Sequence, residues 1–73
     1  MESLYDKYLQ RNGVTRYKVA KMSGVYISTL QRVAKSNEIN NISVRILRAT
    51  AETLGKTPGQ VLDEMLNMEE DSN

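Results

Sequence analysis

The stretch S-G-V-Y-I-S-T-L-Q-R, from Ser23 to Arg32, places a glycine and a β-branched valine between two segments whose apolar residues recur at helical spacing. Glycine in a helix interior costs about 1 kcal/mol relative to alanine, and it readily adopts the left-handed conformation that ends many helices. The stretch therefore predicts a sharp corner at Gly24 between two short helices.

The residues around this corner predict two helices that cross closely. Ala20, four residues before Gly24, is small enough to let the second helix approach. Leu30 and Val33 stand three residues apart on that helix and are expected to point into the core. The outward face then consists of Tyr26, Ile27, Ser28, Gln31 and Arg32. Because a face that meets only water usually carries Glu and Lys, we expect this one to contact a partner.

Three helices are expected in the first half of the chain. The inward residues of the first helix, at residues 3–12, are Leu4, Tyr5, Tyr8 and Leu9. Asn12 and Gly13 provide a left-handed stop after it. Thr15 is a good N-cap for the second helix, which runs through residue 23. Its inward residues are Val19, Ala20 and Met22. The third helix covers residues 27–35, and a polar loop follows.

Two further helices complete the predicted fold. Ser43 caps the fourth helix, which ends at Gly55 and has the inward residues Val44, Leu47, Ala51 and Leu54. Thr57, Pro58 and Gln60 begin the fifth helix with a capping residue, a proline at the first helical position and a glutamine three residues after the cap. Its apolar residues are Val61, Leu62, Met65 and Leu66. We therefore predict an all-α, five-helix domain at residues 1–66, followed by a short acidic tail at residues 67–73 that frays.

Positive charge is concentrated in the middle of the chain. Residues 7–37 hold seven basic residues and no acid, whereas the rest of the chain holds three basic and nine acidic residues. The net charge of +1 hides this segregation. Most domains mix the two signs, so the pattern favours a polyanionic partner, although basic patches without a ligand also occur.

The composition argues against several classes of function. The chain of 73 residues has no His and no Cys, which removes the commonest metal ligand, the commonest neutral-pH base and any thiolate. No nucleophile and base converge, so we expect no enzymatic activity, no metal and no cofactor. No apolar run approaches the roughly 20 residues that cross a bilayer, and the N-terminus lacks the order of a secretion signal. These features predict a soluble protein of the cytoplasm.

Two segments resemble a known family. The run T-R-Y-K-V-A-K-M-S-G-V-Y-I-S-T-L-Q-R-V, at residues 15–33, resembles the helix-turn-helix of the Cro and lambda-repressor-like regulators of phages and bacteria. The run S-V-R-I-L-R-A-T-A-E-T-L-G-K-T-P-G-Q-V-L, at residues 43–62, resembles the fourth and fifth helices of that family. The chain departs from the family at Ala34 and Ser36, where members often carry an acidic residue and a glycine, so Asn37 is expected to close the third helix.

The resemblance implies sequence-specific binding of double-stranded DNA by a small transcriptional regulator, a repressor rather than an activator. The third helix, residues 27–35, would lie in the major groove. The residues expected to read bases are Tyr26, Ile27, Ser28, Gln31 and Arg32. Arg32 is suited to both acceptors of guanine, Gln31 to adenine and Ile27 to a thymine methyl group. The alternatives are a phosphate contact or solvation for Arg32, solvation for Gln31 and a place in the core for Ile27.

Phosphate contacts are expected on both sides of that helix. The start of the second helix has free N–H groups and the positive end of the helix dipole. The residues expected to contact phosphates are Thr15, Arg16, Tyr17, Lys35, Asn40 and Asn41. Arg45 and Arg48 are weaker candidates, because outward basic residues also serve solubility alone.

A second class of function stays open at this point. The same fold serves protein-binding modules, such as an anti-repressor or an antitoxin-like partner, in which Tyr17, Tyr26 and Ile27 would form an apolar contact face. A shift assay with random duplex DNA at low salt separates the two classes.

The resemblance also implies a homodimer, because one recognition helix covers only a few base pairs. The fifth helix carries more apolar residues than one contact line with a small core needs. We assign Met65, Leu66 and Met68 to the dimer interface, and the alternative is that all of them close the core of a monomer.

Overall fold

The structure, a computed structural model, describes residues 3–35 and 42–71. It contains α1 (Leu4–Arg11), α2 (Arg16–Ser23), α3 (Ile27–Ala34), α4 (Val44–Leu54) and α5 (Pro58–Asp71). No strand occurs in the described ranges. The predicted all-α class with five helices is confirmed. The expected loop at residues 36–41, with Asn37, Asn40 and Asn41, lies outside the described residues.

Side-chain caps explain where four of the helices begin. Ser3, Thr15 and Ser43 each accept a hydrogen bond from the backbone N–H three residues later, at 3.2, 3.1 and 3.3 Å. Thr57 Oγ1 accepts from the N–H of Gln60 at 3.1 Å, and Gln60 Oε1 accepts from the N–H of Thr57 at 2.9 Å. These bonds satisfy N–H groups that have no partner inside a helix. The predicted caps at Thr15, Ser43 and Thr57 are confirmed.

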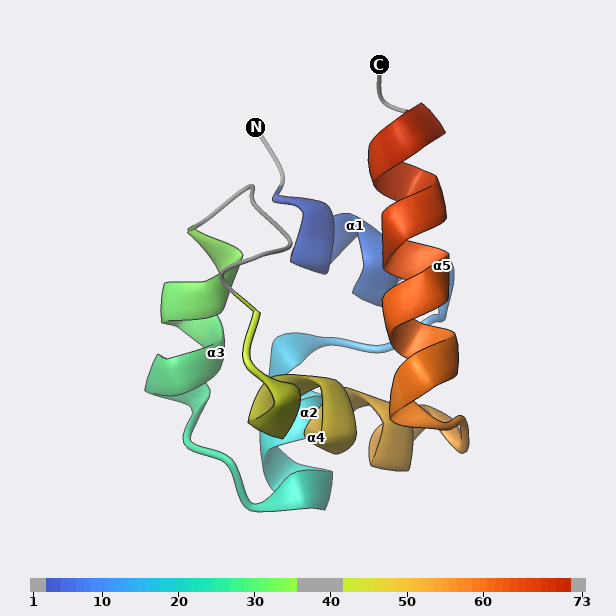
Figure 1. Cartoon of the computed structure of the whole chain (residues 1–73). Helices are drawn as coiled ribbons and strands as arrows, with labels where there is room; N and C mark the ends of the chain where they lie inside the picture. Colours follow the sequence, from blue (N-terminus) through green and yellow to red (C-terminus); the bar gives the residue numbers. More distant parts are fainter. Residues whose placement is uncertain (1–2, 36–41, 72–73) are drawn as a thin grey trace.

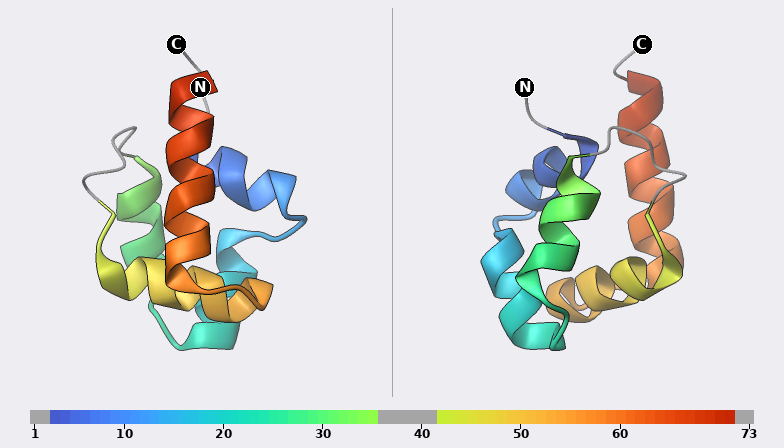
Figure 2. Two further views of the ribbon diagram at one scale, coloured as in Figure 1. Left: turned by 45° about the vertical axis from the view of Figure 1, so that its right-hand side comes forward. Right: turned by 90° about the vertical axis from the view of Figure 1, so that its left-hand side faces the viewer.

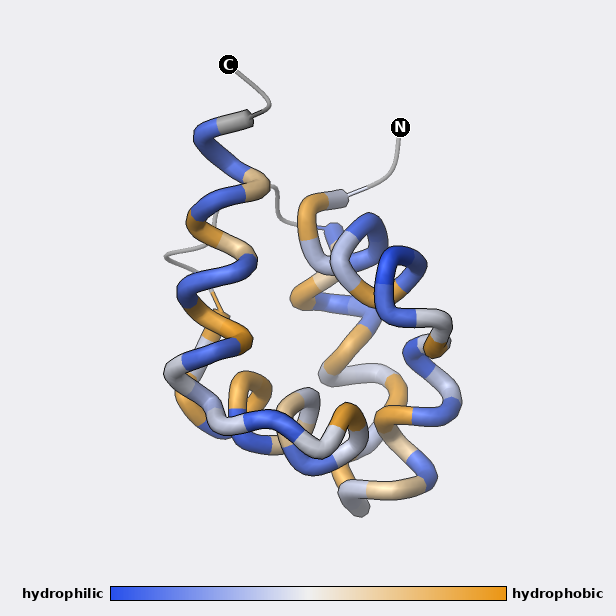
Figure 3. Tube along the Cα trace, turned by 90° about the vertical axis from the view of Figure 1, so that its right-hand side faces the viewer, coloured by the Kyte–Doolittle hydropathy of each residue, from blue (hydrophilic) through white to orange (hydrophobic). Residues whose placement is uncertain are grey.

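The helices enclose one core. α2 packs against α3 and α4, whereas α5 packs against α1 and α4 (Figure 1). The largest fully buried side chains include Tyr5, Tyr8, Leu9, Val19, Leu30, Ile46, Val61 and Met65. Hydrophilic and hydrophobic residues alternate along α5, as expected for a helix with one buried face (Figure 3). The corner between α2 and α3 lies at one end of the molecule and the C-terminal end of α5 at the other (Figures 1 and 2).

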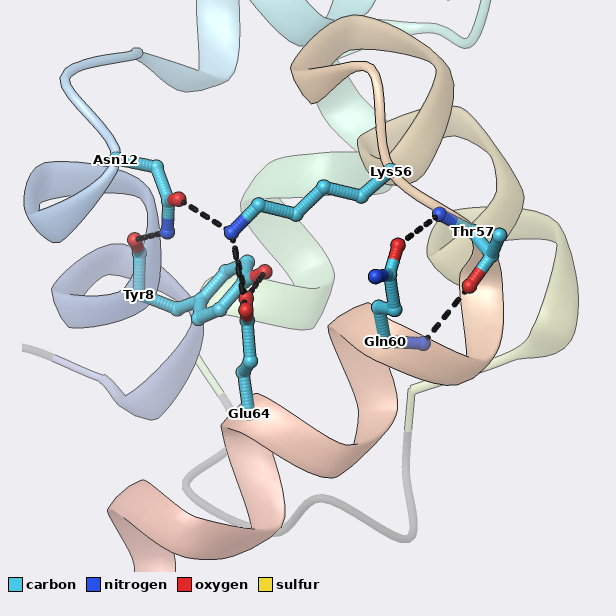
Figure 4. A network of polar contacts seen from close by, with 6 residues as sticks. All are labelled: Tyr8, Asn12, Lys56, Thr57, Gln60 and Glu64. Atoms are coloured by element: carbon cyan, nitrogen blue, oxygen red, sulfur yellow. Dashed lines mark hydrogen bonds and ion pairs between the residues drawn. The ribbon is translucent and has the colours of Figure 1, made fainter.

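A polar network fastens α1 to the start of α5 (Figure 4). Lys56, in the turn between α4 and α5, donates to Glu64 at 2.7 and 3.1 Å and to Asn12 Oδ1 at 3.0 Å. Asn12 Nδ2 donates to the backbone oxygen of Tyr8 at 2.9 Å, and the Tyr8 hydroxyl donates to Glu64 at 2.6 Å. The Lys56 charge is therefore neutralised within the domain.

Several sequence predictions about inward residues are wrong. Met22 and Val44 are exposed, because the inward arcs of α2 and α4 centre on Val19 and on the pair Ile46 and Leu47.

The predicted tail at residues 67–73 is also wrong in its first part, since α5 continues to Asp71. Met68 is 6% exposed, so core contact extends helical structure beyond residue 66.

The dimer interface predicted on α5 needs correction. Met65 is 0% exposed and Met68 is 6% exposed, so both belong to the core of a single chain. Leu66 is 39% exposed and is the one member of the predicted set that reaches the surface. The reason is geometric: α1 and α4 both pack on α5 and cover a broader arc of it than a single contact line would.

Candidate nucleic-acid interface

The corner between α2 and α3 is built by local hydrogen bonds. Gly24 has a φ of +79°, and its N–H donates to the carbonyl oxygen of Ala20 at 3.0 Å. Ser23 Oγ donates to the carbonyl oxygen of Val19 at 2.6 Å and accepts from the N–H of Val25 at 3.3 Å. The predicted left-handed glycine is confirmed. The corner fixes the direction in which α3 leaves α2.

Burial of one side of α3 decides which residues face outward. Leu30 is fully buried, Ala34 is buried and Val33 is half-buried. The opposite side is exposed and carries Ile27, Ser28, Gln31 and Arg32. Within the described part of the chain, the side chains of Ser28, Gln31 and Arg32 make no hydrogen bond or ion pair. Their donors and acceptors are free to meet a ligand.

Tyr26 and Ile27 begin this face. Tyr26 occupies the N-cap position of α3 without a side-chain cap bond and is 81% exposed. Ile27 is 38% exposed, so its predicted outward position is correct and the alternative place in the core is excluded. Exposed apolar area of this kind costs about 25 cal/mol per Å² in water, which a partner surface would recover.

The three residues at the start of α2 that were expected to contact phosphates differ in their exposure and in their contacts. Thr15 Oγ1 is occupied as the helix cap. Tyr17 is 67% exposed. Arg16 is half-buried, and its Nε lies 3.2 Å from Oδ1 of Asp6 on α1.

Asp6 is a neighbour of this surface that sequence reasoning missed. The basic run begins one residue after it, and nothing in the spacing relates residue 6 to residue 16, because the chain turns between two helices. Only the packing of the start of α2 against α1 brings the carboxylate to the guanidinium.

A groove of about 480 Å³ lies beside the corner, between α3 and α4. Its lining includes Tyr26 and Thr29 on one side, and Arg45, Arg48 and the acidic Glu52 on the other. Both arginines are exposed, and neither forms an ion pair within the described residues. From the sequence these two arginines are weaker candidates for phosphate contact, because outward basic residues also serve solubility alone. Their proximity to the first turn of α3 makes Arg45 and Arg48 stronger candidates for phosphate contact.

Charge is distributed unevenly over the fold. Exposed lysines and arginines lie on α1, on α2, at the end of α3 and on α4: Lys7, Arg11, Lys18, Lys21, Arg32, Lys35, Arg45 and Arg48. One exposed acidic residue, Glu52, also lies on α4. Acidic residues recur along α5, which leads away from the corner (Figure 1). Lys35 is exposed at the end of α3, while Asn40 and Asn41 lie outside the described residues.

Comparison with protein-family models finds no matching family, and comparison with curated proteins finds no matching sequence. Along the described residues, no helix is both long enough and apolar enough to cross a membrane. In the same ranges, no three His, Cys, Asp or Glu residues gather closely enough to hold a metal ion.

Proposed function

We propose that this protein is a small transcriptional regulator that binds double-stranded DNA in a sequence-specific manner, with α3 as the recognition helix of a helix-turn-helix. The observation that carries the proposal is the outward face of α3. Three side chains there, Ser28, Gln31 and Arg32, carry hydrogen-bonding groups that have no partner in the described residues. The major groove admits one α-helix and offers each base pair as a distinct pattern of donors and acceptors.

The chemistry of this face suits base edges. Arg32 has a planar fork of donors that matches the two acceptors of guanine, and Gln31 matches the donor and acceptor of adenine. Ile27 offers an apolar contact to a thymine methyl group. In this arrangement α3 supplies specificity, and DNA contact removes exposed apolar area from water.

Cations at the end of α3 and beside its first turn support a phosphate clamp. Lys35 lies at the end of the helix, and Arg45 and Arg48 line the groove next to Thr29. Thr29 and Arg32 are neighbours one turn apart, so this groove borders the same face that would read bases. Each phosphate contact releases counterions and makes binding weaker in salt.

A second candidate, a protein-binding module, is favoured by the exposed apolar side chains. Tyr17, Met22 and Tyr26 are 67%, 58% and 81% exposed. Aromatic residues and methionine are enriched in protein interfaces. This module would use these side chains as an apolar contact face and would not need the free cations.

A gel-shift titration with random duplex DNA at low salt separates the two functions. A DNA-binding protein should shift the duplex and lose affinity as salt rises, whereas a protein-only module should leave it unshifted. Lys35→Ala should lower the salt slope by about one unit, and Lys35→Arg, which keeps the charge, should not. Selection from a random library would then give the preferred site, and repression follows if that site overlaps a promoter.

A further inference from the structure

Asp6 and Arg16 form a contact between two helices at the edge of the proposed DNA-binding surface. The nearest atoms are Oδ1 of Asp6 and Nε of Arg16, which are 3.2 Å apart. The two side chains are 25% and 37% exposed, so the pair is partly shielded from water. Both residues line a hollow of about 240 Å³ between α1 and α2, together with Gln10 and Thr15.

The guanidinium nitrogen that contacts Asp6 determines which donors of Arg16 can still bind a ligand. Nε is the guanidinium nitrogen closest to the backbone, and the two terminal nitrogens lie beyond it. A long side chain such as arginine loses much rotamer freedom when it is fixed on a ligand. This contact restricts that freedom before the ligand arrives, and in the described residues the terminal nitrogens make no hydrogen bond.

We propose that Asp6 is a positioning residue that holds Arg16 in place for a phosphate of the DNA backbone. The proposal rests on the DNA-binding function proposed above. Arg16 is the first residue of α2, where the positive end of the helix dipole and the N–H groups of Arg16 and Tyr17 would favour the same phosphate, whereas the N–H of Lys18 donates to the Thr15 cap. Asp6 would not touch the DNA.

Whether removal of Asp6 weakens or tightens DNA binding distinguishes a positioning role from simple charge repulsion. Asp6 is a negative charge near a polyanion, so simple repulsion predicts that its removal tightens binding at every site. That repulsion is screened over about 8 Å at physiological salt, whereas a direct contact between partly shielded groups is screened much less. If Asp6 positions Arg16, its removal weakens binding instead.

A double-mutant cycle on the full chain tests the inference, with a random duplex as the probe at physiological salt. Asp6→Asn should weaken binding roughly two- to fivefold in the chain that keeps Arg16, and it should not weaken binding in the Arg16→Ala chain. Asp6→Glu, which keeps a carboxylate, should bind more like the wild type. Asp63→Asn removes an exposed acid on α5 and measures the effect of net charge alone.

Three results would overturn the inference while the wild type still binds DNA. Asp6→Asn could tighten binding as Asp63→Asn does, leave it unchanged, or weaken it equally with and without Arg16. Failure of the wild type to bind any duplex at low salt would instead overturn the proposed function, and the role of Asp6 with it. Circular dichroism melting of each variant verifies that the compared chains are folded.

Discussion

The hydroxyl of Tyr8 donates a hydrogen bond of 2.6 Å to Oε1 of Glu64, which joins α1 to α5 across 56 positions of sequence. The same carboxylate accepts two bonds from Lys56. The bonds from Lys56, and then that from Tyr8, hold the pKa of Glu64 below its ordinary value of 4.5. Burial, and then the bond to Glu64, raise the pKa of Tyr8 above its ordinary value of 10.0.

Glu64 should make stability depend on pH in acid. A carboxylate with a lowered pKa in the folded state stabilises the fold above its unfolded pKa, here about 4.5, and loses that contribution as pH falls through the folded pKa. Glu64→Gln should therefore melt at a lower temperature than the wild type at pH 7, and this difference should shrink below pH 4.5. Thermal melts from pH 7 to pH 2 measure it, with Asp63→Asn as the control. A difference that stays constant with pH would contradict the prediction.

Removing the hydrogen bond between Tyr5 and Thr50 should cost less stability when Tyr5 is changed than when Thr50 is changed. Thr50 Oγ1 donates to the carbonyl oxygen of Ile46 at 2.8 Å, so Tyr5 is the donor in the 2.9 Å bond between the two hydroxyls. Tyr5→Phe leaves Thr50 bonded and should cost about 0.5–1.5 kcal/mol. Thr50→Val leaves the buried Tyr5 hydroxyl without an acceptor and should cost about 1–3 kcal/mol.

Urea unfolding of both variants and of the double variant measures the two costs. The double variant should lose less stability than the sum of the single variants, because no hydroxyl is left unsatisfied. Costs that simply add would show that the two side chains do not depend on each other.

Replacement by alanine should lower the stability of the domain at Gly24 and raise it at Gly59. A Cβ at Gly24 meets no atom within 4 Å, so its φ of +79° is the source of strain, and Gly24→Ala should cost about 1 kcal/mol. Gly59 lies in the first turn of α5 without a positive φ, and a Cβ there meets only Thr57 Oγ1 at 4.0 Å. Gly59→Ala should stabilise the domain by up to about 1 kcal/mol. Chemical denaturation compares them. Unchanged stability of Gly24→Ala would contradict the strain at the corner, and a loss in Gly59→Ala would contradict the expected gain in α5.

Met65 and Leu66 are adjacent residues with different expected roles. Met65→Ala opens a cavity in the core and should cost about 2–5 kcal/mol, whereas Leu66→Ala on the surface should cost much less. Met65 is buried and is not expected to belong to the dimer interface assigned from the sequence, whereas Leu66 is exposed. Urea unfolding measures the costs, and sedimentation equilibrium measures self-association. A stable Met65→Ala variant with altered self-association would restore the dimer assignment.

Arg32 should determine preference at one base pair. Arg32→Ala should weaken binding to the selected site by about 1–3 kcal/mol and relax preference at a single position. Arg32→Lys keeps the charge but lacks the planar fork, so it should lose preference at that position while retaining affinity for random duplex. Competition binding against single-base variants of the site measures this. Equal loss on every sequence after Arg32→Ala would reduce the residue to a phosphate contact.

Most of the helix boundaries followed from the sequence. Thr15, Ser43 and Thr57 begin helices because their oxygen atoms satisfy N–H groups three residues away, and Gly24 ends α2 because it tolerates a positive φ. These interactions involve neighbours in the chain, so residue type and spacing predict them. The outward face of α3 was predicted for the same reason, since the helical repeat and one buried leucine fix its orientation.

Tertiary structure decided the features that depend on two or more helices. The sequence shows several apolar residues on α5, but only the joint packing of α1 and α4 puts Met65 and Met68 inside and leaves Leu66 at the surface. The contact of Asp6 with Arg16 and the bond of Tyr8 with Glu64 arise in the same way. Local periodicity gives the direction of a side chain relative to its own helix axis, whereas the neighbour it meets depends on how the helix axes cross.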